Sequence, residues 1–292
     1  EALTTPDTRL ELAMRRDAEG TRSERLTLNN SAVSAQVSGA ADEADGTLAL
    51  TAAVRDMSSV DPRLTGPADI TATLSDLQGT AALVAELDTG FGLGLQLGGS
   101  LAGPDAALRF DGALAAVDRF VPVLRDALQL RGTLDLASAH PVVDAALRAE
   151  PGVMLDVNGP VSGPEAALRF DARLDDLGAF APPLPGPASA TGVLDLSTAA
   201  PTIDATVRAS PAIEARVAGP LTGADAALTI DATIANLGAL VAPLPGPASL
   251  EATLGELSGA PTVSATLLAT GLRGTVQGRI TGPDSGLDVQ AR

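Results

Sequence analysis

The residues with the most recognisable catalytic chemistry surround the single histidine of the chain. His140 follows Ser138 and Asp135, which together are the three residue types of a hydrolase triad. Such a triad is defined by geometry, and the G-x-S-x-G turn that usually presents its serine is absent here. Thr80 and Ala200 stand 60 residues to either side of His140, at equivalent places in the sequence. We therefore interpret His140 as a loop residue and expect no enzyme activity.

Acidic side chains recur once per repeat in a turn, and carboxylates are the usual ligands of Ca²⁺. A calcium ion needs six to eight oxygen ligands, whereas these turns lie about 20 Å apart if four strands separate them. The glycine-rich run at 90–99 also lacks a G-x-G-x-x-G motif before a helix. We expect no metal and no cofactor. The recurring turn acids are Asp45, Asp105, Glu165, Asp225 and Asp284.

The composition excludes several classes of protein. The chain has 292 residues, with 19 basic against 36 acidic side chains and a net charge of −17, which argues against nucleic-acid binding. It has no cysteine, so disulfides and thiolate sites are excluded. Hydrophobic residues make up 45% but aromatic ones only 2%, so any core must consist of small aliphatic side chains. No uninterrupted apolar stretch is long enough for a membrane-spanning helix.

A 60-residue repeat organises the sequence. The segments AALRFDG at 106–112, AALRFDA at 166–172 and AALTIDA at 226–232 are spaced by 60 residues. We predict one repeat array over 1–292, and expect it to be an internal segment of a longer protein. Its predicted units are 1–43 (partial), 44–103, 104–163, 164–223, 224–282 and 283–292 (partial).

Each repeat is predicted to contain four strands. In the third full unit, apolar and polar residues alternate over 168–174, 190–196, 203–208 and 213–218. This period of two is typical of strands with one dry and one wet face. A further segment of each repeat has helical spacing and is predicted to form a short helical turn or crossover loop. These segments are 57–64, 117–124, 177–184 and 237–244.

The pattern favours an all-β fold, an elongated antiparallel β-solenoid in the form of a half-pipe groove or β-taco. The blades of a β-propeller need two apolar faces, immunoglobulin-like modules need about 100 residues, and a parallel β-helix has shorter coils. The continuous apolar stripe is either the core of a closed sandwich or the lining of an open groove. We predict that the groove-lining residues are Leu74, Leu108, Phe110, Leu134, Leu136, Leu168, Phe170, Leu194, Leu196, Ile203, Val207, Val217, Leu228, Ile230 and Leu254.

The repeat texture resembles a known family. A turn of the form GP-acidic, the AALRFDA strand, the DLGAF crossover at 176–180 and the GVLDLS strand at 192–197 are similar to TamB proteins. These are inner-membrane subunits of the translocation and assembly module of diderm bacteria, within the AsmA-like group of repeating β-groove proteins. The resemblance covers the whole chain and favours the groove over the closed sandwich.

The resemblance implies a function and a location. It implies a periplasmic groove, anchored to the inner membrane by a segment outside this chain, that conducts phospholipid between the two membranes or supports outer-membrane protein assembly. Its partners would be phospholipid acyl chains, an outer-membrane barrel protein reached through a missing region, and unfolded outer-membrane clients. The alternatives are a scaffold or chaperone that pairs with client strands, and a closed structural or adhesin stalk.

Overall fold

The computed structural model describes most of the chain as β-structure. The described residues are 9–16, 22–40, 46–59, 64–124, 127–182, 184–210, 212–223, 226–240, 244–257, 261–280 and 285–292. Within them lie twenty strands and four 3-10 helices of three residues each. The chain divides into two compact units, residues 1–150 and 151–292. No helix in the described residues is long and apolar enough to cross a membrane.

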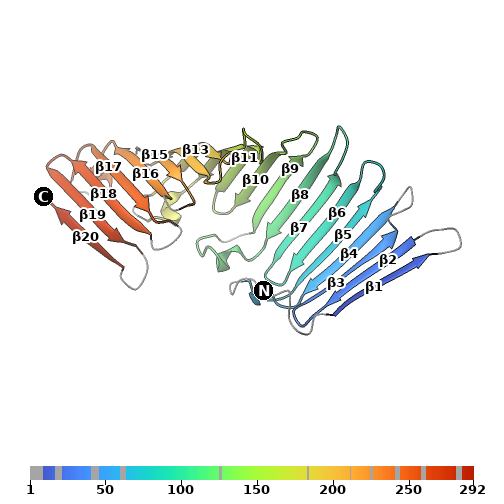
Figure 1. Ribbon diagram of the computed structural model, residues 1–292. Helices are drawn as coiled ribbons and strands as arrows, with labels where there is room; N and C mark the ends of the chain where they lie inside the picture. Colours follow the sequence, from blue (N-terminus) through green and yellow to red (C-terminus); the bar gives the residue numbers. More distant parts are fainter. Residues whose placement is uncertain are drawn as a thin grey trace. The chain divides into compact units, whose positions relative to one another are not determined.

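Unit 1 is an antiparallel sheet in which consecutive strands are neighbours (Figure 1). Short turns join most of these pairs, as expected for period-two segments that turn residues separate. Its strands are β1 (Arg9–Arg16), β2 (Arg22–Asn29), β3 (Val33–Ala40), β4 (Thr47–Val54), β5 (Ala68–Ser75), β6 (Ala82–Thr89), β7 (Leu93–Ser100), β8 (Ala107–Leu114), β9 (Leu128–Asp135) and β10 (Val142–Ala149).

Unit 2 has the same antiparallel, sequential arrangement (Figure 1). Its strands are β11 (Val153–Pro160), β12 (Ala167–Leu174), β13 (Ala188–Asp195), β14 (Thr202–Ala209), β15 (Ile213–Pro220), β16 (Ala227–Ile234), β17 (Ala248–Gly255), β18 (Thr262–Ala269), β19 (Leu272–Arg279) and β20 (Gly286–Ala291). The all-β, antiparallel part of the predicted fold is therefore confirmed.

The predicted helical turns are present as 3-10 helices. They follow β4, β8, β12 and β16, and each is only three residues long, because proline and glycine residues interrupt these segments. They are η1 (Met57–Ser59), η2 (Val117–Arg119), η3 (Leu177–Ala179) and η4 (Leu237–Ala239). Parts of the predicted segments, 60–63, 183 and 241–243, lie outside the described residues.

The register keeps the apolar positions of neighbouring strands opposite one another. Leu168 on β12 pairs with Leu194 on β13, which pairs in turn with Ile203 on β14. Side chains alternate between the faces of a strand, and a slip of one residue would exchange them. From β4 to β10 and from β12 to β20, one face of the sheet is therefore mainly apolar and the other mainly polar.

Glycine at one repeating position allows two strands to approach closely. Gly99, near the end of β7, has a φ of 151°, and Gly159, near the end of β11, has a φ of 147°. A Cβ atom on Gly99 would lie 1.9 Å from the carbonyl oxygen of Ala107 on the next strand. Only glycine adopts this backbone conformation at low cost, and only glycine leaves room for that oxygen.

A small aromatic cluster packs at the η2 crossover in unit 1. Phe91, in the β6–β7 turn, is only 6% exposed, and its ring meets that of Phe120 edge-on, with centroids 6.2 Å apart. Val117 and Leu124 from the same crossover are 2% and 6% exposed. The crossover thus supplies two of the buried hydrophobic residues of this unit.

We predict that Gly99→Ala is strongly destabilising and that Gly98→Ala is not. Gly99→Ala should lower the free energy of unfolding by about 2–4 kcal/mol, because it combines backbone strain with a clash against Ala107. Gly98 lies outside the left-handed region, and a Cβ atom added there would lie 3.7 Å from its nearest non-local neighbour. Its substitution should change stability by less than about 1 kcal/mol. Urea unfolding followed by circular dichroism measures both, and equal losses would contradict the role of the close approach.

Candidate functional site

Thirteen of the fifteen predicted groove residues lie on strands and share the apolar face of their unit. In unit 1, Leu74, Leu108 and Leu134 belong to one line of paired residues, which we call the leucine row. The row also contains Gly99, opposite Leu108. Leu136 and Leu196 were predicted at strand ends but lie one residue beyond β9 and β13. Their amides donate to the carbonyls of Ala106 and Ala166, each over 2.8 Å.

The leucine row recurs in unit 2. Leu168, Leu194 and Ile203 follow one another on β12, β13 and β14, and Ile203 faces Gly219 on β15. On β16 and β17, Leu228 pairs with Leu254. Aliphatic residues or glycine occupy this register on successive strands, so the row runs from β4 to β10 in unit 1 and from β12 to β20 in unit 2. On β2 the register place belongs to Glu24, the partner of Gly39.

A second line of residues, the central row, pairs large side chains with small ones. Phe110 lies opposite Gly132, and a Cβ atom on Gly132 would be 2.4 Å from Cζ of Phe110. Phe170 likewise pairs with Gly192, whereas Ile230 pairs with Ala252. On its other side each of these large residues has a large partner, Leu97 for Phe110, Val157 for Phe170 and Val217 for Ile230.

The apolar face is half-buried within each unit. Of the fifteen predicted residues only Leu108, at 8% exposed, belongs to the buried set. No large side chain of the described residues is fully buried. A closed sandwich core would bury most of these side chains. Within either unit, the structure therefore does not support the packed-sandwich alternative.

Crossover segments cover one margin of the apolar face. Leu237 of η4 is 5% exposed and packs with Ile234 and Ala248, at the ends of β16 and β17. Leu240 and Leu244 from the same crossover complete this contact. The crossover covers the apolar face where the strands end, while the rows farther along the strands stay half-exposed.

A side-chain oxygen closes each of three crossovers. Oδ1 of Asp176 accepts hydrogen bonds from the amides of Gly178 and Gly186, both at 2.9 Å. These hydrogen bonds lower the pKa of Asp176, that to Gly186 having the larger effect. Asp56 and Asn236 make the corresponding pair of bonds in their own crossovers. We call Asp56, Asp176 and Asn236 the crossover clamps.

The polar face carries arginine–carboxylate pairs that join neighbouring strands. Arg216 on β15 donates two hydrogen bonds to Asp204 on β14, at 3.0 and 2.7 Å. This pairing lowers the pKa of Asp204 and raises that of Arg216. Arg131 and Asp111 form a similar pair between β9 and β8 at 2.7 Å.

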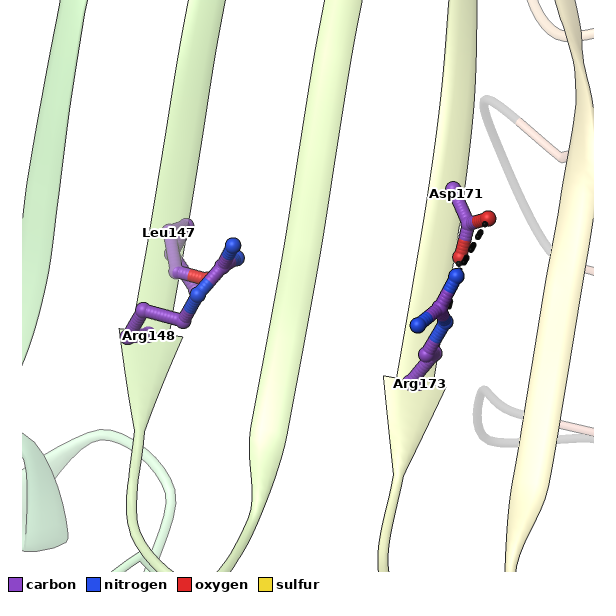
Figure 2. A network of polar contacts seen from close by, with 4 residues as sticks. All are labelled: Leu147, Arg148, Asp171 and Arg173. Carbon is purple, nitrogen blue, oxygen red and sulfur yellow. Dashed lines mark hydrogen bonds and ion pairs between the residues drawn. The ribbon is translucent and has the colours of Figure 1, made fainter.

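Two arginines make contacts within their own strands. Figure 2 shows Arg173 paired with Asp171 on β12, and Arg148 on β10 turned back to the carbonyl of Leu147. The side chains of Arg173 and Asp171 remain 64% and 40% exposed. Exposed pairs contribute little to stability, so these contacts add charge to the polar face more than they stabilise it.

A cavity of 1180 Å³ in unit 2 lies at the ends of the strands, and none of the predicted groove residues lines it. Arg173, Arg208 and Ser249 line it from the polar face. Ile213, Ile234 and Ala248, which belong to the apolar face, line it as well. None of the fifteen predicted residues lines this cavity. The fifteen residues thus form an apolar face away from this hollow, whose lining contains both charged and apolar residues.

Ser138 and Asp135, the other two residues of the possible triad at His140, form hydrogen bonds with backbone groups of the same loop. The hydroxyl of Ser138 donates to the backbone carbonyl of His140 over 2.5 Å, and Asp135 accepts from the amide of Ala137 over 2.8 Å. All of these side chains are exposed. Asp105 and Glu165 lie in exposed turns, and the other predicted turn acids, Asp45, Asp225 and Asp284, lie outside the described residues.

Comparison with known proteins adds no relatives. No family model, no curated protein and no solved structure matches this chain.

We predict that the crossover clamp needs a hydrogen-bond acceptor at position 176, and that this acceptor can be either neutral or charged. Asp176→Ala removes both hydrogen bonds and should speed amide exchange at Gly178 and Gly186 roughly three- to tenfold. Asp176→Asn should be nearly silent, because Asn236 already makes the same contacts. Hydrogen–deuterium exchange at neutral pH measures this.

The clamp also has a defined pH dependence. The folded-state pKa of Asp176 lies below the ordinary value of 3.8, so its contribution is complete above that value and is lost as the pH falls through the folded pKa. Relative to the intrinsic exchange rate at each pH, exchange of the Gly186 amide should rise in this acidic range in the native protein and not in Asp176→Asn. Identical acid profiles would show that the carboxylate is not the group that titrates.

Proposed function

We propose that this chain is a segment of a lipid-conducting β-groove of the TamB type. Acyl chains of phospholipid would lie against the apolar face of each unit, with their head groups in water. The observation that carries the proposal is the leucine row, which runs without a polar side chain from β4 to β10 and again from β12 to β20.

The energetics suit a hydrocarbon ligand. Each CH₂ group moved from water to an apolar surface gains about 0.8 kcal/mol when fully buried, and less on an open face. The central row, in which Phe110 lies opposite Gly132, adds a second apolar line beside the leucine row. A hydrocarbon chain would meet similar contacts on successive strands, so it could be held without being fixed at one position.

The composition of the apolar face is consistent with an acyl-chain ligand. The three rows that contain Leu194, Gly192 and Ala190 on β13 hold only glycine, alanine, larger aliphatic residues and phenylalanine across β12 to β19. Such a surface has no side-chain group that could bind a phosphate or a sugar. The ligand that it matches is therefore an acyl chain and not a head group.

The proposal includes a cellular setting. The protein would act in the periplasm of a diderm bacterium, anchored to the inner membrane and coupled to an outer-membrane barrel protein by regions outside this chain. Support of outer-membrane protein assembly would use the same apolar face for unfolded clients. A strand-pairing scaffold differs in that it uses a strand edge, so its crosslinks would map to edge strands.

Two neighbouring substitutions on β13 test the proposal. Leu194 is half-buried on the apolar face, and Val193 beside it is 38% exposed on the polar face. Leu194→Asp should weaken binding of a phospholipid with a fluorescent acyl chain roughly tenfold, about 1.4 kcal/mol, because it places a carboxylate in the row. Val193→Asp introduces the same charge on the wet side and should bind like the native protein.

The outcomes separate the alternatives. Circular dichroism and urea unfolding establish that both variants are folded before binding is compared. Native mass spectrometry of the purified chain should also show co-purified lipid. Absence of lipid binding by the native chain, or equal binding by both variants, would refute the acyl-chain proposal.

A further inference from the structure

Near one end of its strands, unit 2 has a serine between two arginines. Ser189 on β13 pairs with Arg173 on β12 on one side and with Arg208 on β14 on the other. We call these three residues the charged trio. All three line the 1180 Å³ cavity at the strand ends. Guanidinium and hydroxyl groups are hydrogen-bond donors that suit a carboxylate or a phosphate.

Both arginines keep hydrogen-bond donors for a further anion. Arg208 binds Glu214 on β15 through Nε and Nη2, at 3.2 and 2.8 Å. Arg173 uses the same two nitrogens for Asp171, the pair drawn in Figure 2. Neither of these pairs uses Nη1, which also carries N–H donors. Both pairs are exposed, so an incoming anion can compete with the two carboxylates at little cost.

The next repeat supplies an uncharged part of the same lining. The residues 60 positions after the charged trio are Thr233, Ser249 and Leu268, and all three line the cavity. They are consecutive partners on β16, β17 and β18. Leu268 is 44% exposed, and Ile213 and Ile234 add apolar surface to the lining. The lining therefore changes from cationic to apolar across the strands.

The equivalent trios of unit 1 differ in charge. They are Ala53, Asp69 and Asp88, 120 positions before the charged trio, and Ala113, Gln129 and Arg148, 60 positions before it. The first has two carboxylates, which would repel an anion, and the second has one arginine. Among these trios, two cations flank a hydroxyl group only in the charged trio, although the chain as a whole carries a net charge of −17.

We propose that this cavity binds an amphiphile with an anionic head group and a single hydrocarbon chain. The head group lies at Ser189, between Arg173 and Arg208, and the hydrocarbon chain lies along the apolar part of the lining. A fatty acid and a fatty-alcohol phosphate share this chemistry. No residue of the leucine row lines the cavity, so this site is separate from the proposed acyl-chain surface. The inference goes beyond the proposed function and does not depend on it.

Methyl NMR of the full chain tests where such a ligand binds. Of the six isoleucines, Ile213 and Ile234 line the cavity, whereas Ile203 and Ile230 lie in the leucine and central rows. Laurate and dodecyl phosphate, each below its critical micelle concentration, should shift the δ1-methyl signals of Ile213 and Ile234 first. The tighter of the two identifies the head group as a carboxylate or a phosphate. Dodecyl maltoside has the same chain with an uncharged head group and should bind the cavity roughly tenfold more weakly.

Two arginine substitutions provide a matched pair. Arg208→Gln removes a guanidinium group from the charged trio and should weaken binding of the tighter anion roughly tenfold. Arg216 also pairs with a carboxylate between β15 and β14 but does not line the cavity, so Arg216→Gln should bind like the native chain. Both arginine side chains are exposed, so both variants should fold. Ser189→Asp places a carboxylate between the two arginines and should prevent anion binding.

Several results would overturn the proposal. Equal binding of dodecyl maltoside and the anions would show that the cavity does not recognise a charged head group. Equal losses in Arg208→Gln and Arg216→Gln would assign the effect to net charge alone. Anion-induced shifts at Ile203 and Ile230 without shifts at Ile213 and Ile234 would reject the cavity while supporting the acyl-chain surface. The reverse pattern would support the cavity and count against that surface.

Discussion

The strand register is the constraint on which the other features of each unit depend. From β4 to β10 and from β12 to β20 the strands alternate between apolar and polar residues, and only the register decides whether neighbouring strands place these on the same side. Leu194 faces Leu168 and Ile203, while its neighbour Val193 lies on the same face as Arg169 and Asp204. A slip of one residue would bring Asp204 into the leucine row. The glycines at 99 and 159 support the register, because a Cβ atom at either position would collide with a carbonyl oxygen of the next strand.

The strands and the dry face could be predicted from sequence because both follow from alternation along a single segment. The AALRFDG and AALRFDA segments give β8 and β12, and the predicted leucines share a face. The ends of strands were less accurate, as Leu136 and Leu196 show, because alternation continues into the turn after hydrogen bonding between strands has stopped. The short helical turns were recognisable from proline and apolar spacing.

Features that depend on contacts across strands or across loops were not predicted. Asp176 bonds to an amide ten residues away, and no local pattern specifies that partner. The repeat itself held a signal, since Asp56, Asp176 and Asn236 precede the crossovers at one spacing and each is able to accept two amide bonds. The pairing of Phe110 with Gly132 was also visible only after the register of β8 and β9 was known. Comparison of repeats with one another would have indicated both.

The two faces of the sheet contribute differently to stability because their side chains differ in charge and burial. Arg216 and Asp204 keep 64% and 57% of their side-chain surface exposed, so their pairing orients strands more than it stabilises them. Stability must therefore come from the apolar face, yet that face is only half-buried within each unit. A ligand that binds the folded state alone adds stability in proportion to its occupancy. A hydrocarbon ligand on the leucine row would cover the exposed apolar surface and so remove the free-energy cost of leaving it in water. Binding of such a ligand would therefore also stabilise the fold.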